Sequence, residues 1–407
     1  MGVLLNKADP MIVHVDLNSC FATVEQQAHP SLRGKPVVIA AYVTDRGCIL
    51  SPSIEAKKLG IKTGMKVYEA KKIYPNVIVR DTDPIIVRDV HSKFMKIFGD
   101  YSPHVIPKSI DEAIIDFSPV FSKTTDLVKI GKEIKNRMRQ EIGDWISCNI
   151  GIATNRFLAK TAASLHKPDG LDLINYKNLK QVYASIKLTD LHGINTRFEY
   201  RLNANGINSP LDFFQAEVNF LKKNVFKSIT GYYWYLRLHG WEIDDFESTR
   251  KSFGQEYSLK EKTEDPNKLK KIIMKLCEKM GRRLRQSNQL ASGIHLGVLY
   301  QDYSFWHRGK KINKSIASTK NLFEEIMILF FLQPKIIVVS KISVSCFSLN
   351  QNSSQQLALI DLGEEKTNRI SGALDKINDR FGEFTITPAI MMDMKDTMVD
   401  RIAFGKS

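Results

Sequence analysis

Two adjacent carboxylates, Asp111 and Glu112, lie in the segment "SIDEAIID" among apolar residues that favour β structure. Neighbouring side chains of an extended segment point to opposite faces, so Glu112 is expected on one face with Ile110 and Ile114, and Asp111 on the other. One face then carries an acid toward a core, where an ionised carboxylate requires an ion pair, a proton or a metal ion. A hairpin end at "VIPKSIDE" that leaves both acids in water is the simpler interpretation of this segment taken alone.

A third acid, Asp16, ends a predicted buried strand, "MIVHVD". A helix is expected directly after it, in "NSCFATVEQQAHP", where Asn18 is able to cap the first turn. Acids at the C-terminal edge of a sheet face a crevice rather than the interior of the sheet. Further along, a strand at 146–153 and a helix opened by Thr154 or Asn155 make the first 168 residues a series of strands interleaved with helices.

The composition is that of an ordinary globular protein with a basic surface. The 407 residues, of which 43% are hydrophobic, are enough for more than two packed domains. The net charge of +15 favours a polyanionic partner such as nucleic acid, although a solvated lysine-rich surface would give the same charge.

Targeting and cysteine patterns predict a cytoplasmic protein without a membrane partner. The longest apolar run, "IMILFFL", is too short to cross a bilayer, and the start, "MGVLLNKADP", lacks the basic region and apolar core of a signal peptide. The five cysteines are odd in number and include no CxxC pair, which argues against a disulfide framework and a zinc ribbon.

Two short helices are expected around the turn "HGIN". Gly193 in this turn could offer backbone N–H groups to a DNA phosphate, as in a helix-hairpin-helix. Asn195 stands where a second glycine is usual, and asparagine tolerates the left-handed conformation better than most residues. Any helical pair needs a turn, so the pattern alone does not establish DNA binding.

The last region repeats a strand-helix-strand order. The helix expected at 266–286 buries an apolar stripe: Leu269, Ile272, Ile273, Leu276 and Met280. Strands that present Arg250, Lys251 and Lys341 outward would form a sheet that follows nucleic-acid phosphates. A solvated basic surface is the alternative interpretation.

Three ordered motifs, "VDLNSCFATVEQ", "SIDEAIID" and "CNIGIATNRFLAKTAASLHKPDG", resemble the Y family of translesion DNA polymerases, including its bacterial DNA polymerase IV and SOS mutagenic subunit branches. The resemblance implies a multidomain α+β or α/β fold. This fold is a right hand with a ferredoxin-like palm, small fingers, a helical thumb and a β-α-β-β-α-β little finger. The implied domains are the palm at 1–32 and 84–168, the fingers at 33–83, the thumb at 169–240, a linker at 241–250, the little finger at 251–350 and a tail at 351–407.

The resemblance also implies the residues of a metal site. Asp16, Asp111 and Glu112, with the backbone carbonyl of Leu17, would hold two Mg²⁺ ions, although carboxylate oxygens accept Mn²⁺ as well. Carboxylates suit this role because paired Mg²⁺ ions can activate a primer 3′-hydroxyl and stabilise the pyrophosphate leaving group.

Other positions match the nucleotide contacts of the family. Phe21 matches the steric gate that excludes a ribose 2′-hydroxyl, with Cys20 beside it, although a core phenylalanine has the same spacing. Lys57 and Lys167 match cations that bind the triphosphate. Two departures affect this site: Ile54 stands where tyrosine is frequent, and Lys57 replaces a frequent arginine and so gives up bidentate geometry.

The tail contains a segment, "QQLALIDL", that is similar to the sliding-clamp peptide of bacterial polymerases. Its expected anchors are Gln356, Leu357, Leu359 and Ile360, with an apolar strand as the alternative. The resemblance therefore implies primer-template DNA, a dNTP and a sliding clamp as partners of a monomeric enzyme.

Two main classes of function follow from the sequence. The first is a template-directed DNA polymerase that adds dNTPs to a primer 3′-hydroxyl in translesion synthesis. The second is a non-catalytic or partner-dependent relative that binds DNA within a mutagenic repair complex. The intact acids favour the first class, and the basic helical turn and clamp-like peptide argue against a nucleotide cyclase, a third class with a palm-like metal site.

Overall fold

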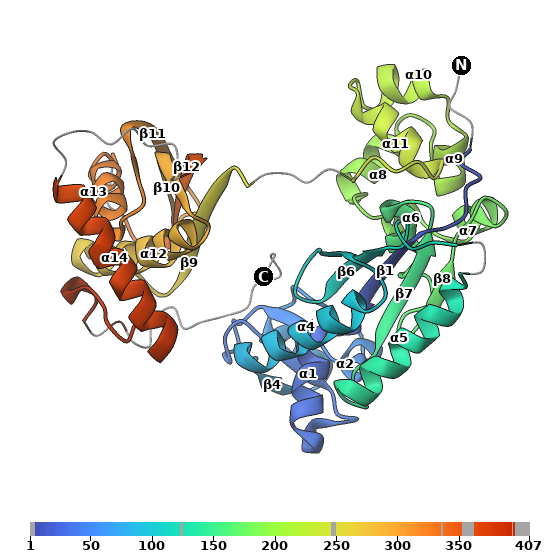
Figure 1. Ribbon diagram of the computed structural model, residues 1–407, viewed down its shortest axis with the longest axis horizontal. Coiled ribbons are helices and arrows are strands. Elements are labelled where there is room, and N and C mark those ends of the chain that lie inside the picture. Colours follow the sequence, from blue (N-terminus) through green and yellow to red (C-terminus); the bar gives the residue numbers. More distant parts are fainter. Residues whose placement is uncertain are drawn as a thin grey trace. The chain divides into compact units, whose positions relative to one another are not determined.

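The computed structural model describes residues 5–122, 125–245, 250–334, 337–351, 362–392 and 394. These residues divide into a first unit, which covers the described residues up to 245, and a second unit, which begins at residue 250 (Figure 1). Each unit has its own hydrophobic core. Within the described ranges, no helix combines the length and the apolar character that crossing a bilayer requires.

The first unit is built on a five-stranded sheet with the order β5-β6-β1-β7-β8. Its strands are β1 (Ile12–Leu17), β5 (His104–Pro107), β6 (Glu112–Asp116), β7 (Cys148–Ala153) and β8 (Leu171–Leu173). Neighbouring strands are antiparallel except for the parallel pair of β7 and β8. Because β1 is the central strand, the acid at its end has a neighbouring strand on either side.

Alternation along β1 divides its side chains between two cores. Val13 and Val15 pack with one set of helices (Figure 1): α1 (Cys20–Ala28), α4 (Pro84–Gly99) and α5 (Leu127–Glu141). Ile12 packs on the opposite face with α6 (Arg156–Ala162). Since side chains two residues apart share a face, His14 and Asp16 lie on the α6 side of the sheet.

The alternation predicted for "SIDEAIID" is wrong at its start. Ile110 was expected to share a face with Glu112, but it belongs to the core on the opposite face of the sheet. The reason is that β6 begins only at Glu112, after a turn over residues 108–111 that is closed by backbone N–H groups donating to the Glu112 carbonyl. Asp111 therefore lies in a turn, and its carbonyl accepts the N–H of Leu17 at 2.9 Å.

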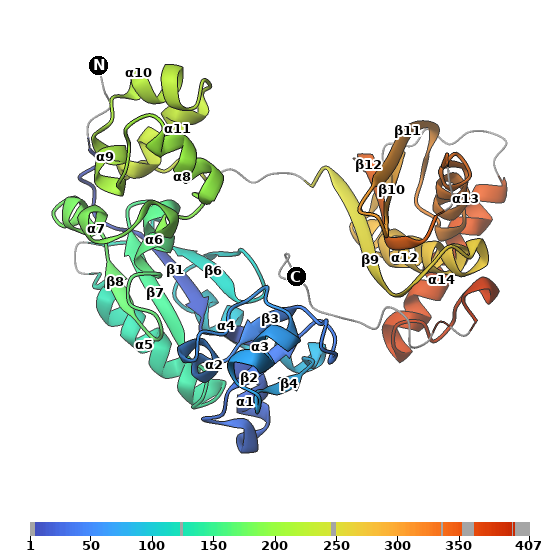
Figure 2. The ribbon, with the colours of Figure 1, turned by 180° about the vertical axis from the view of Figure 1, so that it is seen from behind.

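A smaller sheet, with the strand order β3-β2-β4, is formed by the part of the chain that follows α1 and precedes α4 (Figure 2). Its elements are η1 (Pro30–Leu32), β2 (Val37–Ala40), β3 (Ile49–Pro52), α2 (Ile54–Lys58), α3 (Val67–Ile73) and β4 (Ile78–Arg80). The Ser53 hydroxyl caps α2 by accepting the N–H of Ala56 at 3.2 Å. This cap fixes the first turn of the short helix that carries Lys57.

Short helices complete the first unit after β8. They are α7 (Leu179–Ser185), η2 (Leu188–Asp190), α8 (Thr196–Asn203), α9 (Pro210–Gln215), α10 (Val218–Phe220), η3 (Leu221–Val225) and α11 (Thr230–Leu238). Their apolar side chains share a core with α6, where the rings of Phe157 and Trp234 meet edge to face with centroids 5.6 Å apart. This core joins the helices to the α6 face of the main sheet.

The second unit confirms the predicted β-α-β-β-α-β order. Its elements are β9 (Ser252–Thr263), α12 (Pro266–Gln286), β10 (Gln289–Tyr300), β11 (Phe305–Ile316), α13 (Thr319–Phe330) and β12 (Val339–Gln351). The strands form one antiparallel sheet with the order β11-β10-β12-β9. The predicted apolar stripe of α12 is buried in the core of this unit, as helical spacing requires.

A C-terminal segment adds α14 (Leu362–Phe381) and η5 (Ala389–Met391) to the second unit. Arg285 of α12 makes two hydrogen bonds to the Asp375 carboxylate, at 2.6 and 2.7 Å. Met391 is buried in the core of the second unit. Part of the region that the sequence division assigns to a tail therefore packs onto α12.

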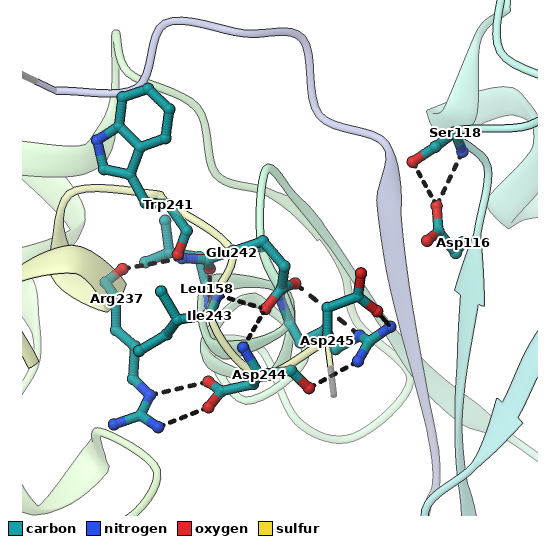
Figure 3. A network of polar contacts seen from close by, with 11 residues as sticks. Asp116, Ser118, Leu158, Arg237, Trp241, Glu242, Ile243, Asp244 and Asp245 are labelled. Atoms are coloured by element: carbon teal, nitrogen blue, oxygen red, sulfur yellow. Dashed lines mark hydrogen bonds and ion pairs between the residues drawn. The ribbon is translucent and has the colours of Figure 1, made fainter. Parts of the chain in front are cut away.

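The segment 241–245, which follows α11, is bound to the start of α6 (Figure 3). The backbone N–H of Arg156 donates to the Glu242 carboxylate at 2.9 Å, and its guanidinium donates to the Asp244 carbonyl at 2.6 Å. The Asp244 carboxylate in turn accepts two hydrogen bonds from Arg237, at 2.8 and 2.5 Å. Residues 241–245 are thereby fixed to the first unit.

We expect Arg156→Ala to lower the free energy of unfolding of the first unit by roughly 2 kcal/mol, the loss typical of charged hydrogen bonds. The side chain is only 7% exposed, so water cannot fully replace it as a donor to the segment 241–245. Thermal unfolding of the full chain measures the effect, with Lys129→Ala, an exposed substitution on α5, as the control. Equal melting temperatures for Arg156→Ala and the control would contradict this role.

Candidate active site

One cavity of about 490 Å³ in the first unit brings together all the residues that the sequence predicts for the metal site and the nucleotide contacts. It is lined by Asp16, Leu17, Cys20, Phe21, Lys57, Asp111, Glu112 and Lys167. These residues come from the end of β1, the start of α1, α2, the turn before β6, the first residue of β6 and the loop after α6. The fold thus joins positions that are up to 151 residues apart in the chain, as Asp16 and Lys167 are.

Strand pairing brings the three acids together. Asp16 and Glu112 are direct partners in the antiparallel ladder of β1 and β6. Directly opposite residues of such a ladder place their side chains on the same face. Asp111 comes one residue earlier, in the turn that hydrogen-bonds to Leu17, and its carboxylate opens into the same cavity.

Each acid has a different partner. The Lys167 ammonium lies 2.5 Å from an Asp16 carboxylate oxygen. The Lys160 ammonium, from α6, donates to both oxygens of Glu112, at 2.7 and 3.0 Å. Asp111 accepts a hydrogen bond from the Ser109 hydroxyl at 2.5 Å, which is a neutral donor. Two acids are therefore held by cations and one by a hydroxyl.

Burial and the neighbouring acids make the charged form of the Asp111 carboxyl unfavourable, which raises its pKa. Burial is the largest cause that raises the pKa of Asp111, and the charges of Asp16 and Glu112 raise it further, while the Ser109 hydrogen bond opposes them. Burial also raises the pKa of Cys20 well above its usual value, with Asp111 and Asp16 adding to the effect. Three lysines also line the cavity (Lys57, Lys108 and Lys167), so burial rather than an excess of acids is the first cause of both shifts.

The donor groups fit a hard divalent cation. Carboxylate and carbonyl oxygens are the ligands that Mg²⁺ prefers, and the raised pKa of Asp111 indicates a place where added positive charge is favourable. In the part of the chain that the structure describes, no three acidic, histidine or cysteine side chains are already grouped closely enough to hold a metal ion. Lysines, rather than shared oxygens, hold Asp16 and Glu112.

The residues that the sequence predicts for nucleotide contacts give the cavity an apolar wall and two cations. Phe21, on α1, is 0% exposed and forms part of the wall. Lys57, on α2, has a lowered pKa, first because its amine loses water and second because the Lys167 charge is close. Two ammonium groups that repel each other across a cavity form a site that favours a polyanion.

Two residues on the α6 face, Lys160 and His14, were not expected at the site from the sequence. His14 lies with its Nε2 3.8 Å from the Glu112 carboxylate, and within the described residues neither ring nitrogen has a hydrogen-bond partner. Burial, and then the Lys160 charge, lowers the pKa of His14 to about 3, so its ring is neutral at physiological pH. Strand alternation with Asp16 was the available signal for His14.

The turn "HGIN" lies between η2 and α8, with a different geometry from the one expected. Gly193 has a positive φ of 90°, which favours glycine. The expectation of a left-handed Asn195 is wrong, because its φ is −109° and it is the N-cap of α8. Its side chain accepts the N–H groups of Arg197 and Phe198, both at 3.2 Å, so these donors already have a partner within the protein.

The predicted basic contacts of the second unit belong to β9 and β12 or lie beside them. The guanidinium of Arg250 lies 4.8 Å from the centroid of the Phe253 ring. Lys251 is exposed directly before β9, and Lys341 on β12 lies 3.3 Å from the Glu256 carboxylate. The predicted clamp anchors lie outside the described residues: Gln356, Leu357, Leu359 and Ile360.

Comparison with known proteins shows the family of this chain. The impB/mucB/samB family matches residues 15–164, and the C-terminal domain of that family matches residues 250–359. The chain is 30% identical to DNA polymerase IV of Pelotomaculum thermopropionicum over 397 residues, which cover 96% of this chain and 97% of that protein. The chain belongs to the Y family of translesion DNA polymerases.

A further relative and two solved structures support the same family and fold. DNA polymerase IV 1 of Bacillus subtilis is 27% identical over 406 residues, 97% of this chain and 96% of that protein. A Y-family DNA polymerase chimera, Dbh-Dpo4(243-245)-Dbh, superposes with a TM-score of 0.71 at 25% identity over 84% of this chain and 100% of that one. An insertion ternary complex of Dbh DNA polymerase, at 24% identity and a TM-score of 0.59, has the same fold over the same shares of the two chains.

The predicted enzyme class and fold class are confirmed. This polymerase is a DNA-directed DNA polymerase with the multidomain right-hand fold of its family. Membership of the family also implies dependence on divalent metal ions.

The raised pKa of Asp111 predicts that its ionised carboxylate lowers the free energy of unfolding. An acid whose pKa is higher in the folded state than its usual value of 3.8 binds its proton more tightly when folded, so ionisation at higher pH destabilises the fold. We expect Asp111→Asn to raise the free energy of unfolding of this polymerase in metal-free buffer at neutral pH. The gain should disappear as the pH falls through the raised pKa toward 3.8.

Melting temperatures at neutral and acidic pH measure this effect. Asp81→Asn, an exposed substitution outside the cavity, is the matched control and should change little at either pH. Added Mg²⁺ should stabilise the wild type more than Asp111→Asn, because only the wild type keeps all three carboxylates. A lower melting temperature for Asp111→Asn in metal-free neutral buffer would show that the ionised carboxylate of Asp111 does not destabilise the fold.

Proposed function

We propose that this polymerase adds dNTPs to the 3′-hydroxyl of a primer paired with a template strand, using two Mg²⁺ ions at the cavity in translesion synthesis. One observation carries this proposal: three acids meet in a cavity that three lysines and a buried phenylalanine also line. The acids suit the metal-dependent chemistry, the lysines suit a triphosphate, and the phenylalanine suits a sugar.

Asp16, Asp111 and Glu112, with the backbone carbonyl of Leu17, are the proposed metal ligands. When bound, paired divalent ions activate the primer hydroxyl and stabilise the charge that develops on the pyrophosphate leaving group. The raised pKa of Asp111 supports this assignment, because positive charge added beside its buried carboxylate is favourable. Mn²⁺ is the alternative ion, since it accepts the same oxygen ligands.

Lys57 and Lys167 are the proposed cations for the triphosphate. The Lys167 charge helps to lower the pKa of Lys57, and a bound polyanion would relieve this repulsion. Both act as point charges, because an ammonium lacks the two-pronged geometry of a guanidinium. Lys167 lies against Asp16, so it links the triphosphate side of the cavity to the acids.

Phe21 is the proposed steric gate, with Cys20 beside it. The Phe21 ring lines the cavity near the acids and is fixed by burial in the core between the main sheet and α1. A ring that cannot move aside leaves no room for a ribose 2′-hydroxyl. The Cys20 thiol stays protonated because burial and the nearby acids raise its pKa well above the usual range.

Contacts outside the cavity complete the proposal. Gly193, Asn195, Arg250, Lys251 and Lys341 are proposed to contact the backbone of primer-template DNA, consistent with the net charge of +15. A monomeric enzyme is proposed to bind a sliding clamp through the segment "QQLALIDL" at the four anchors named above.

Primer extension by the purified full chain tests the proposal. We expect Asp111→Asn to reduce dNTP addition by roughly a thousandfold, the effect of losing several kcal/mol of transition-state stabilisation. The dissociation constant for primer-template DNA should change little, because the substitution removes a metal ligand and no phosphate contact. Asp81→Asn, the exposed control, should extend primers at the wild-type rate.

The wild type also distinguishes the two classes of function. Template-directed extension that disappears in Asp111→Asn supports a polymerase that uses this cavity. Tight binding of primer-template without extension, in both Mg²⁺ and Mn²⁺, would instead show a non-catalytic or partner-dependent protein. Undiminished extension by Asp111→Asn would place the chemistry elsewhere.

Phe21→Ala should admit ribonucleotides. We expect the ratio of kcat/KM for dNTPs to that for rNTPs to fall by roughly tenfold to a hundredfold, because the clash with the 2′-hydroxyl is removed. Phe94→Ala is the matched control: Phe94 is 1% exposed in the same core, but it does not line the cavity. The control should lose stability and keep its sugar selectivity. Unchanged selectivity in Phe21→Ala would reject the gate.

A further inference from the structure

The side chain of Asn149 connects two segments that carry proposed ligands. Asn149 lies on β7 directly opposite Asp16 in the strand ladder, and it is 1% exposed. Its Nδ2 donates to the Asn18 side-chain oxygen at 2.5 Å, and its Oδ1 accepts the backbone N–H of Gly170 at 2.9 Å. One buried amide therefore bridges the turn after β1 and the loop after α6.

The direction of this amide is fixed by its partners. A backbone N–H can only donate, so the oxygen of Asn149 must face Gly170 and its NH₂ group must face Asn18. A side chain at this position therefore needs a donor and an acceptor at opposite corners of one short planar group. Asparagine meets this requirement, whereas an apolar residue of the same size would leave both partners unsatisfied.

On one side, the bridge holds the turn that follows the first acid. Asn18 lines the cavity two residues after Asp16, and its backbone N–H donates to the Ser147 carbonyl at 2.9 Å. Its Nδ2 donates to the Ser147 hydroxyl at 3.0 Å. The turn is thus attached to β7 and the residue before it by several hydrogen bonds, of which Asn149 makes one.

On the other side, the bridge holds the loop that carries Lys167. Gly170 returns this loop to the sheet, where its carbonyl accepts the N–H of Ile150 at 3.0 Å. A Cβ at Gly170 would lie 2.3 Å from the His166 carbonyl oxygen, so the loop is tightly folded where Asn149 holds it. The side chain of Lys167 extends from this loop to the carboxylate of Asp16.

We infer that Asn149 is a positioning residue for nucleotide binding, which sets where the Lys167 ammonium stands relative to the acids. Asn149 does not line the cavity, so it acts through Lys167 rather than by contact with the nucleotide. The inference rests on the proposed role of Lys167 as a triphosphate ligand. Displacements of about 1 Å at such groups are enough to change catalysis substantially.

A double-mutant cycle on the full chain separates positioning from simple stabilisation. The variants are Asn149→Leu, Lys167→Ala and the combination of both. Steady-state primer extension, corrected for the fraction of active enzyme, gives KM for the dNTP and kcat, and thermal unfolding gives stability. The correction removes the effect of unfolded enzyme, so lost stability alone leaves KM unchanged.

We expect Asn149→Leu to raise KM for the dNTP by roughly tenfold, which corresponds to about 1.4 kcal/mol. In the Lys167→Ala background, the same substitution should raise KM by much less, because the group that Asn149 positions is absent. Asn378→Leu is the matched control: Asn378 is a buried amide of α14, 4% exposed, that bonds to the backbone of Ile386. It should lower stability without changing KM.

The outcomes distinguish this inference from the proposed function. If Lys167→Ala raises KM but Asn149→Leu does not, Asn149 is not a positioning residue, and the triphosphate site stands. Equal effects of Asn149→Leu in both backgrounds would likewise overturn the inference, because the effect would not pass through Lys167. If Lys167→Ala leaves KM unchanged, Lys167 does not bind the triphosphate, and the inference about Asn149 is rejected as well. Should Asn149→Leu fail to fold, Asn149→Ser takes its place, since its shorter side chain cannot span both partners.

Discussion

The concentration of negative charge at the end of β1 is the constraint on which the first unit depends. Pairing of β1 with β6 places Asp16 opposite Glu112, and the turn before β6 adds Asp111. No local change relieves this repulsion, because strand register fixes the positions of the acids. The surrounding structure responds with cations at two acids and a hydroxyl at the third. A fold that keeps these acids close together accepts a cost in stability.

Helix α6 and the loop after it supply much of the opposing charge. Lys160 of α6 holds Glu112, and Lys167 of the loop holds Asp16. The start of α6 is in turn bound to the segment 241–245, through the backbone and guanidinium of Arg156. One short helix thus connects the acids with the last described residues of the first unit. The neutral ring of His14 fills the buried space beside Glu112 without adding charge to the cluster.

In the second unit, basic side chains of α12 form ion pairs within the unit. Its helix α12 has an apolar stripe in the core, while basic side chains pair with acids of α14: Arg282 with Asp379, and Arg285 with Asp375. Lys275 is buried beneath the C-terminal segment and donates to the Met394 carbonyl at 2.8 Å. Much of the positive charge of this helix is therefore satisfied within the unit. The net charge of the chain is a general property that favours polyanions, and the individual basic residues differ in how far they are committed to internal partners.

The sequence by itself predicted the strand-helix order of the second unit, the apolar stripe of α12 and, through its family resemblance, the acids, Phe21, Lys57 and Lys167 that line the cavity. These features depend on local periodicity or on residues within single motifs. Tertiary structure decided which face a side chain lies on and which distant residues it contacts, because both depend on strand register and on segments far apart in the chain. Ile110 changed face because a turn delays β6, and Asn195 became a helix cap because its side chain found local N–H groups. Lys160, His14 and Asn149 gained their roles only when strands and loops far apart in the chain met, since no spacing reports a hydrogen bond across 131 residues.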